Sequence, residues 1–315
     1  MLLRSALGIL PFAALACGSS ASPPGHGGGS SSAVSTTTGA GAGEGGAASC
    51  PSCEEPGSAG ELANPAIDET SGLVASALHP GSYYLHNDSG DSARFFAIGP
   101  AGEDRGTYLL EGVVAVDWED MARGPCAGEG SCLYFADFGD NATQRAEYVI
   151  HRVAEPARLA PGVQSLPFES FRYVYPDGAH NAEALLVHPT SGAPIILTKD
   201  ARRTQIFELP LPLDASRVVT ASLLGEATLP DLLPLATGAD FAPDGSSILV
   251  RTYTSLWFYG VAPGESVAAA LSRVPCSLPV AGEQQGEAIA WALDGKSYVT
   301  VSEGVGAAIH VAGCR

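Results

Sequence analysis

The chain has 315 residues, of which 45% are hydrophobic, and a formal net charge of −18 at pH 7. This length and composition suit one sizeable core with appendages, or at most two modest cores. The negative charge argues against nucleic acid or an anionic membrane surface as a partner, because like charges repel one another within a Debye length. Cations and cationic ligands are favoured.

The first residues have the pattern of a signal peptide. One basic residue, Arg4, precedes an apolar run over residues 6–16, which Pro11 interrupts and which is too short to span a membrane. The run ends in small residues before Cys17, so we expect a signal peptide over 1–16 and Cys17 as the acylated first residue of a bacterial lipoprotein. Cleavage sites of ordinary secreted proteins look similar and are the alternative.

Residues 17–59 consist mainly of Gly, Ser, Thr and Ala and have almost nothing to bury. This composition is typical of a flexible tether, which leaves residues 60–315 as the folded domain. We therefore expect an exported, monomeric protein on the outer face of a bacterial membrane, held there only by its lipid. The periplasm or the extracellular space is the alternative location.

The cysteine count fits export. Seven cysteines, less Cys17 if it is acylated, leave six, which suits an oxidising compartment. Cys126 and Cys132 flank a tight loop and are predicted to pair with each other. The remaining cysteines allow three connectivities, among which the sequence does not choose: Cys50, Cys53, Cys276 and Cys314. The spacing of the first two of these also occurs in redox and zinc sites, but no second ligand pair accompanies it.

Beyond residue 60, short β-rich runs alternate with turns of Gly, Pro and Asp, and helical periodicity is almost absent. Five similar units follow one another. Each unit opens with a carboxylate, continues as a small or apolar strand, and turns into a second apolar strand that ends in polar residues. The opening carboxylates are Glu69, Glu119, Glu183, Asp240 and Glu287. This repeat predicts an all-β chain in which each unit is one blade of a β-propeller.

A third strand is expected in every unit and a fourth in the first four, but the chain ends at Arg315 before the last unit has a fourth strand. The segment 60–67 can supply that strand and close a five-bladed ring without exposed sheet edges. Two alternatives use the same strands. One is a two-sheet sandwich, and the other is a six-bladed ring, if the long third unit hides a divergent blade.

The first strand of a propeller blade lines the central channel and pairs antiparallel with the second. The five opening carboxylates should therefore form a ring at one mouth of the channel. Residues that end the second strands, or that follow them closely, should lie beside this ring: Asn87, Asp88, Asp137, Asn141, Lys199, Arg251 and Glu303. Polar groups that converge on the axis make this mouth the default binding site.

Five crowded carboxylates cannot all stay ionised without compensation. Ca²⁺ accepts about six to eight oxygen ligands and suits such a ring, so we expect Ca²⁺ to be bound by the five opening carboxylates. Lys199 and Arg251 would offset the remaining charge, or hold a phosphate or carboxylate ligand. Ordinary salt bridges that fix the inner strands are the alternative.

Several short motifs together resemble a known group of proteins. They are Glu69-Thr-Ser-Gly-Leu73, His86-Asn-Asp-Ser-Gly-Asp91, Asp117-Trp-Glu-Asp120, Phe138-Gly-Asp-Asn141, Glu155-Pro156, Asn181-Ala-Glu-Ala184, Thr198-Lys199, Arg251-Thr-Tyr253 and Gln285-Gly-Glu-Ala288. This set looks like uncharacterised bacterial secreted propellers that are grouped near the "esterase-like activity of phytase" domain, and the resemblance implies fold and export. A more distant similarity is to calcium-activated nucleotidases (apyrases), which implies an axial Ca²⁺ at the opening carboxylates, with Glu69 or Ser71 in the first unit.

Two functions fit these features. The first is a cell-envelope or secreted binding and scaffold lipoprotein, whose partner is a small anionic ligand or an envelope protein. The second is a Ca²⁺-dependent phosphoric ester or anhydride hydrolase, in which Glu183 activates water while Lys199 and Arg251 hold phosphate oxygens. The sequence contains no Gly-x-Ser-x-Gly, His-Glu-x-x-His or Walker motif, so it indicates no standard nucleophile or zinc machinery.

Overall fold

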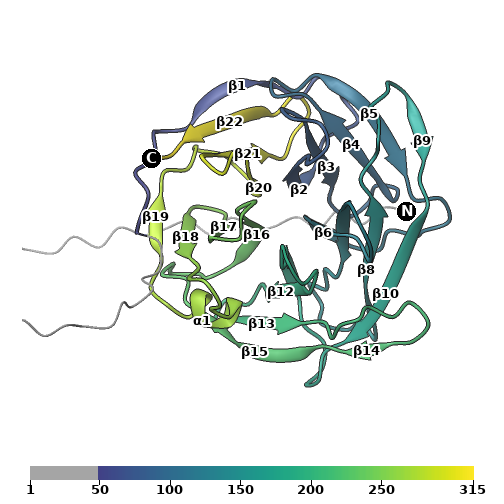
Figure 1. Cartoon of the computed structure of the whole chain (residues 1–315), viewed down its shortest axis with the longest axis vertical. Helices are drawn as coiled ribbons and strands as arrows, with labels where there is room; N and C mark the ends of the chain where they lie inside the picture. The colour runs from purple at the N-terminus through teal and green to yellow at the C-terminus, as the bar shows by residue number, and fades with distance from the viewer. Residues whose placement is uncertain (1–48) are drawn as a thin grey trace, which may run out of the picture. The chain divides into compact units, whose positions relative to one another are not determined.

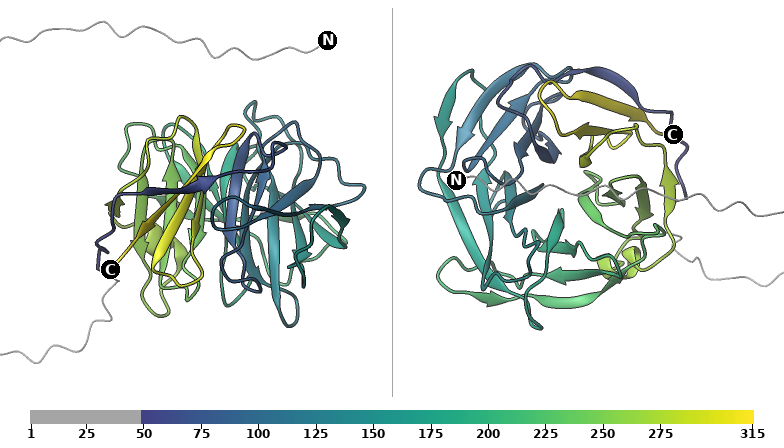
Figure 2. Two further views of the ribbon diagram at one scale, coloured as in Figure 1. Left: turned by 90° about the horizontal axis from the view of Figure 1, so that it is seen from above. Right: turned by 180° about the vertical axis from the view of Figure 1, so that it is seen from behind.

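The repeated units fold into five mainly antiparallel sheets that stand in a ring around a common axis, as Figures 1 and 2 show. A computed structural model describes residues 49–315 of the chain. The predicted signal peptide, the acylation site Cys17 and most of the predicted tether lie outside these residues. The prediction of a five-bladed β-propeller is confirmed, and the sandwich and six-bladed alternatives are excluded.

The first two blades each contain four strands of their own unit. Blade 1 contains β2 (Thr70–Ala75), β3 (Tyr83–Asn87), β4 (Arg94–Ile98) and β5 (Asp104–Leu109). Blade 2 contains β6 (Trp118–Pro125), β7 (Ser131–Asp137), β8 (Tyr148–Ala154) and β10 (Phe168–Val174). The innermost strand of each blade is also the first along the chain.

The next two blades follow the same order. Blade 3 contains β11 (Ala182–Val187), β12 (Pro194–Thr198), β13 (Thr204–Glu208) and β15 (Ser222–Ala227). Blade 4 contains β16 (Ala236–Phe241), β17 (Ser247–Thr252), β18 (Leu256–Gly260) and β19 (Cys276–Leu278), with the short helix α1 (Val267–Leu271) before its last strand.

Blade 5 combines the two ends of the described chain. It contains β20 (Gly286–Trp291), β21 (Ser297–Ser302) and β22 (Ala308–Gly313), and its outer strand is β1 (Gly57–Glu61), which pairs antiparallel with β22. Figure 1 shows β1 in purple beside β22 in yellow. The predicted closing strand therefore exists, but it lies slightly earlier than residues 60–67.

Two disulfides fasten this closure. Cys53 is bonded to Cys314 and Cys50 to Cys276, so the segment before β1 is linked both to the C-terminus and to β19. The folded part of the chain thus begins before residue 60, within the segment whose composition suggested a tether. The sequence left this pairing open because cysteine spacing alone carries no information on which cysteines meet.

The long connections between the third and fourth strands of blades 2 and 3 each add a strand to the preceding blade. β9 (Val163–Ser165) pairs parallel with β5 of blade 1, and β14 (Val219–Thr220) pairs parallel with β10 of blade 2. The extra residues of the long third unit therefore contribute to β14 and its loop, and do not form a sixth blade.

The core lies between neighbouring blades. Five hydrophobic clusters occupy the five interfaces, and every residue of β2, β11, β16 and β20 is buried. Strands covered on both faces lose the alternation of apolar and polar residues, which explains why these inner strands have continuous small and apolar sequences.

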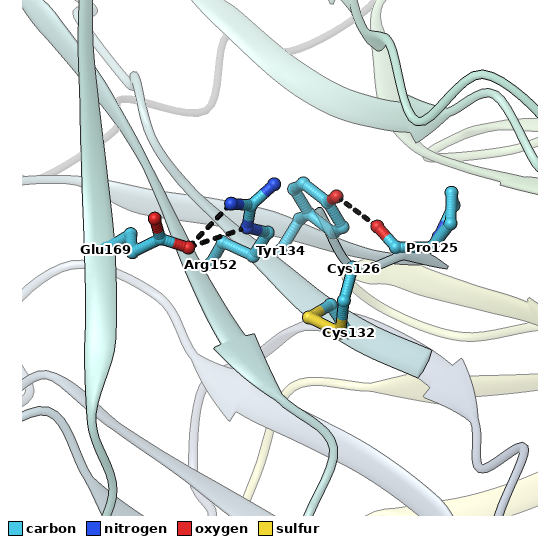
Figure 3. Close-up of a disulfide and its surroundings, with 6 residues drawn as sticks. All are labelled: Pro125, Cys126, Cys132, Tyr134, Arg152 and Glu169. Atoms are coloured by element: carbon cyan, nitrogen blue, oxygen red, sulfur yellow. Dashed lines mark hydrogen bonds and ion pairs between the residues drawn. A yellow bond between two sulfur atoms is a disulfide. The ribbon is translucent and has the colours of Figure 1, made fainter. Parts of the chain in front are cut away.

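The predicted Cys126–Cys132 disulfide is confirmed and closes the turn between β6 and β7 (Figure 3). Tyr134, two residues after the second cysteine, donates a hydrogen bond from its hydroxyl to Pro125 O at 2.6 Å. The disulfide and this hydrogen bond together fix the end of blade 2 that is opposite to the starts of the inner strands.

Candidate functional site

The starts of the inner strands meet the ends of the second strands at one end of the axis, as predicted. Trp118 faces Asp137 in blade 2, for example, and the other four blades have the equivalent pairing. The register shifts by a β-bulge at this point in every blade, and a bulge re-aims the side chain it contains. The residues at the second position of the inner strands are Ser71, Glu119, Glu183, Thr237 and Glu287.

Two of the predicted ring carboxylates lie outside this set. Glu69 precedes β2 and is exposed, and Ser71 takes the bulged position of blade 1. Asp240 is the fifth residue of β16 and does not open the strand, and its Oδ2 accepts a hydrogen bond from Trp291 N at 2.8 Å. The units were aligned on their nearest carboxylates, and this alignment was wrong for blades 1 and 4. The bulged position of these two blades holds a residue with a hydroxyl group, which carries no charge by which the repeat could be recognised.

The two hydroxyls at the bulges connect neighbouring inner strands. Ser71 Oγ donates a hydrogen bond to Glu119 O of blade 2. Thr237 Oγ1 donates one to Gly286 O of blade 5 at 3.4 Å. Both hydroxyls are thus engaged in holding blades together, and the three glutamates remain as the ionisable groups of the ring.

Four carboxylates gather around that of Asp88, which directly follows β3. One oxygen from each of Asp88, Asp117 and Glu119 lies within 4.8 Å of the others, and the same is true of Asp88, Glu287 and Glu303. We call these five residues the acidic cluster. They come from blades 1, 2 and 5, and Asp88 belongs to both groups.

Two of the three glutamates of the acidic cluster are almost completely buried, and Glu303 is half-buried. Glu119 is 4% exposed and Glu287 is 5% exposed. Burial, together with repulsion from Glu183 and other carboxylates, raises the pKa of Glu287 to about 8 and holds the pKa of Glu119 well above its usual range. Burial also raises the pKa of Asp88 to about 6. Glu119 and Glu287 therefore either retain protons near neutral pH or require a cation.

Glu287 has one oxygen without a partner. Its Oε2 is buried and accepts no hydrogen bond from any residue between 49 and 315. A buried charged acceptor that stays unpaired costs more than about 1–3 kcal/mol. A cation bound between Glu287, Asp88 and Glu303 would supply the missing partner.

Lys199 lies beside the acidic cluster, as predicted, and it is held firmly. Its Nζ donates hydrogen bonds to the carboxylate of Glu183 and, at 2.6 Å, to Tyr253 Oη, and it lies 4.7 Å from the centre of the Tyr253 ring. The pKa of Lys199 is raised by Glu183 and Tyr253, although burial opposes this effect. Burial raises the pKa of Glu183 to about 6 and that of Tyr253 to about 12. The three residues form one hydrogen-bonded group.

Arg251 is not available to a ligand, and this prediction is corrected. Its side chain is fully buried between blades 4 and 5, where it pairs with Glu283 and donates a hydrogen bond to Ala288 O at 3.1 Å. Glu283 also accepts hydrogen bonds from Thr300 Oγ1 and His310 Nδ1. Arg251 was predicted to face the channel because it ends a second strand, but its side chain turns into the blade interface.

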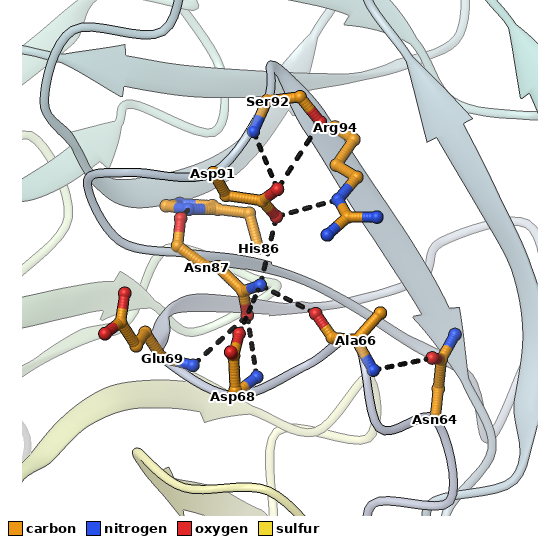
Figure 4. A network of polar contacts seen from close by, with 9 residues as sticks. All are labelled: Asn64, Ala66, Asp68, Glu69, His86, Asn87, Asp91, Ser92 and Arg94. Carbon is orange, nitrogen blue, oxygen red and sulfur yellow. Dashed lines mark hydrogen bonds and ion pairs between the residues drawn. The ribbon is translucent and has the colours of Figure 1, made fainter.

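Asn87 was predicted to bind a ligand, but its amide is used within blade 1, as Figure 4 shows. Its Nδ2 donates to Ala66 O, Asp68 Oδ1 and Asp91 Oδ2 at 2.8–3.0 Å, and its Oδ1 accepts from the backbone N of Asp68 and Glu69. These bonds fix the segment that leads into β2. The role of Asn87 is therefore to position neighbouring groups.

Asp137 also has an internal role. Its carboxylate accepts hydrogen bonds from Val116 N and Asp117 N at 3.0 and 3.1 Å and pairs with Arg145 at 2.8 Å. It therefore fixes the loop that carries Asp117 of the acidic cluster. Asn141 is exposed and accepts a hydrogen bond from Asn181 Nδ2 at 3.2 Å, so it remains accessible near the site.

Two residues of the site were not assigned to it from the sequence. Asp117 immediately precedes β6, and Tyr253 immediately follows β17. Both occur within motifs that are recognisable in the sequence, but neither opens an inner strand nor repeats from unit to unit. Asp117 would have been found by a search for polar residues that lie next to the first residue of each inner strand.

No protein-family model matches the chain, and no curated protein matches it. Fold and site therefore define its class: a disulfide-bonded five-bladed propeller with an acidic cluster at one end of its axis. The three disulfides fit an exported protein. Among residues 49–315, no helix is long and apolar enough to cross a membrane.

Proposed function

We propose that the protein is an exported binding propeller that holds a divalent cation in the acidic cluster. The observation that carries the proposal is the buried, unpartnered Oε2 of Glu287 beside Asp88 and Glu303. Every candidate ligand is a carboxylate oxygen, which favours a hard cation such as Ca²⁺. An exposed anionic group of a small ligand or an envelope protein would complete the coordination of the ion.

In this proposal the lipid at Cys17 and the Gly-rich segment after it hold the propeller at the outer face of a membrane. The site would then bind its ligand at the cell envelope without turnover. This location is supported by the apolar run before Cys17 and by the disulfides of the propeller.

Calorimetric titration of the metal-free full chain with CaCl₂ tests the cation site. Asp88→Asn should weaken Ca²⁺ binding most, because Asp88 belongs to both carboxylate groups, and Glu287→Gln should weaken it by at least about tenfold. Glu129→Gln is the matched control, since Glu129 is an exposed carboxylate on the turn between β6 and β7. The proposal fails if the wild-type chain contains no metal after purification and takes up no Ca²⁺, Mg²⁺ or Mn²⁺ at millimolar concentration.

A second candidate function is a Ca²⁺-dependent phosphoric ester or anhydride hydrolase, favoured by the contact between Lys199 and Glu183 beside the cluster. The cation would polarise the phosphoryl group, Glu183 would take the proton of the attacking water, and Lys199 would hold a phosphate oxygen. Arg251 has no part in this scheme because it is buried.

A screen of phytate, nucleotides and p-nitrophenyl phosphate, with and without Ca²⁺, separates the two functions. Ca²⁺-dependent turnover that Glu183→Gln and Lys199→Met abolish would support the hydrolase and overturn the non-catalytic binder. If the wild-type chain binds Ca²⁺ but turns over none of these substrates, the hydrolase is rejected for these substrate classes.

A further inference from the structure

Exposed aliphatic side chains lie on loops at the same end of the axis as the acidic cluster. Eleven large hydrophobic side chains are exposed between residues 49 and 315. Five of them belong to only three loops, which all lie at the end of the axis where the inner strands start. These five are Val114, Val116, Leu232, Leu233 and Val305. Single exposed aliphatic residues are ordinary, whereas a group around a polar site indicates an interaction surface.

The positions of the three loops follow from the topology. The loop between β5 and β6 carries Val114 and Val116 and leads directly into Asp117 of the acidic cluster. The loop between β21 and β22 carries Val305, two residues after Glu303 of the same cluster. The aliphatic side chains of these two loops thus lie next to carboxylates along the chain.

The third loop, between β15 and β16, is held in place by its own contacts. Asp231 accepts hydrogen bonds from Ser255 Oγ and Trp257 Nε1, both at 2.6 Å. This arrangement fixes the loop beside the segment that carries Tyr253. The next residue, Leu232, is 98% exposed, so an ordered loop presents a large aliphatic side chain to solvent.

Carboxylates outnumber basic side chains at this end of the propeller. Glu69 and Glu183 lie beside the five carboxylates of the acidic cluster, and the neighbouring Lys199 and Arg145 are already paired with Glu183 and Asp137. We call the five exposed aliphatic residues of the three loops the aliphatic rim. We propose that the acidic cluster and the aliphatic rim bind a polypeptide segment of a partner protein in which Lys or Arg alternates with aliphatic residues. Ammonium or guanidinium groups would enter the cluster while aliphatic side chains pack on the rim.

This inference shares its carboxylates with the proposed cation site but does not require the cation. A divalent ion and a basic side chain would compete for Asp88 and Asp117, so Ca²⁺ should weaken binding of the segment. An anionic lipid surface fits the rim less well, because the chain carries a net charge of −18 and would be repelled.

Fluorescence anisotropy with the full chain in EDTA tests the proposal. The probe is a short, capped, fluorescein-labelled peptide in which Lys alternates with Leu, compared with peptides in which Glu replaces Lys or Ser replaces Leu. We expect only the Lys–Leu peptide to bind well. The double substitution Leu232→Ser and Val114→Ser should weaken its binding by about tenfold or more, and Asp117→Asn should weaken it as well.

Two controls exclude general stickiness and general charge attraction. Val274→Ser removes an exposed aliphatic side chain just before β19, and Glu129→Gln removes an exposed carboxylate at the opposite end of blade 2. Neither should change peptide binding. The rim double variant should keep its Ca²⁺ affinity, because neither residue belongs to the acidic cluster.

The outcomes separate this inference from the proposed function. Ca²⁺ binding without peptide binding overturns the inference alone, and peptide binding without Ca²⁺ binding overturns the cation site alone. The inference also fails if the two control substitutions weaken peptide binding as much as the double substitution Leu232→Ser and Val114→Ser does. It fails equally if the chain does not bind the peptide but floats together with phosphatidylglycerol vesicles. That result would mean that the rim binds a membrane.

Discussion

Asp120 in blade 2 accepts a hydrogen bond through its Oδ2 from the backbone N of Ala239 in blade 4 at 3.2 Å, although the two residues are 119 positions apart. The same oxygen accepts one from Leu185 N of blade 3 at 2.8 Å, and Oδ1 accepts one from Met121 N. One buried carboxyl group therefore joins three inner strands across the axis. Its burial raises the pKa of Asp120 well above the usual range.

Asp120→Ala should lower the free energy of unfolding by about 3 kcal/mol or more, because it leaves three buried N–H groups without an acceptor. Asp120→Asn keeps one acceptor oxygen and should cost about 1 kcal/mol. Urea-induced unfolding followed by tryptophan fluorescence measures both values. Equal losses in the two variants would show that the hydrogen bonds to this side chain contribute little.

The fold could be predicted because the sequence pattern that produces each blade repeats along the chain. Every inner strand is buried on both faces, so each unit begins with a small or apolar run, and a turn separates that run from a second one. Even the closing strand was predictable, since the last unit lacks a partner for β22. The pairing of Cys50 and Cys53 was not predictable, because it depends on where the ring happens to bring the two chain ends together.

The site could be predicted only in part. Glu119, Glu183 and Glu287 were placed correctly near the axis because they share one position of the repeat. Asp240 and Arg251 failed for different reasons. Asp240 is the fifth residue of β16, so the repeat was aligned on a carboxylate far from the start of the strand. Arg251 lies near the expected end of its strand, but strand position does not tell where a side chain points. Long-range contacts such as the Arg251–Glu283 pair leave no trace in local sequence.

Ring closure by Cys53–Cys314 should contribute more to stability than Cys126–Cys132. The two bonds span 261 and 6 residues. The chain-entropy model predicts that Cys53–Cys314 stabilises the fold by about 4 kcal/mol when Cys50–Cys276 is intact. It predicts about 2 kcal/mol for Cys126–Cys132. Replacing each pair by alanines and measuring unfolding in urea tests this ranking.

The ranking would be contradicted if removal of Cys126–Cys132 cost as much as removal of the closing bond. Hydrogen exchange provides a second readout. Loss of Cys53–Cys314 should increase exchange in β1 and β22, because β1 is the strand that the bond retains. Blade 3, which is distant from the closure along the ring, serves as the internal control.

Arg251 should matter for stability and not for ligand contact. Arg251→Met removes one partner of a buried ion pair and leaves Glu283 without its guanidinium partner, so the free energy of unfolding should fall by about 3–5 kcal/mol. The double substitution Arg251→Met and Glu283→Leu should cost less than the sum of the two single substitutions. A stable Arg251→Met variant that had lost ligand binding would restore the original prediction for this residue.

Asp240 should make the stability of the propeller depend on pH. Burial raises its pKa from 3.8 to about 7, so the folded protein keeps a proton that the unfolded chain releases above pH 3.8. This contribution to stability is complete below pH 3.8 and is lost as the pH rises toward 7, by up to about 1.4 kcal/mol per pH unit.

Asn at this position can still accept the hydrogen bond from Trp291 N but does not titrate. The free energy of unfolding of the wild type, relative to Asp240→Asn, should therefore fall between pH 4 and pH 7 and stay constant above pH 7, as measured by urea unfolding at a series of pH values. A difference that does not change with pH would mean that Asp240 is already ionised in the folded protein.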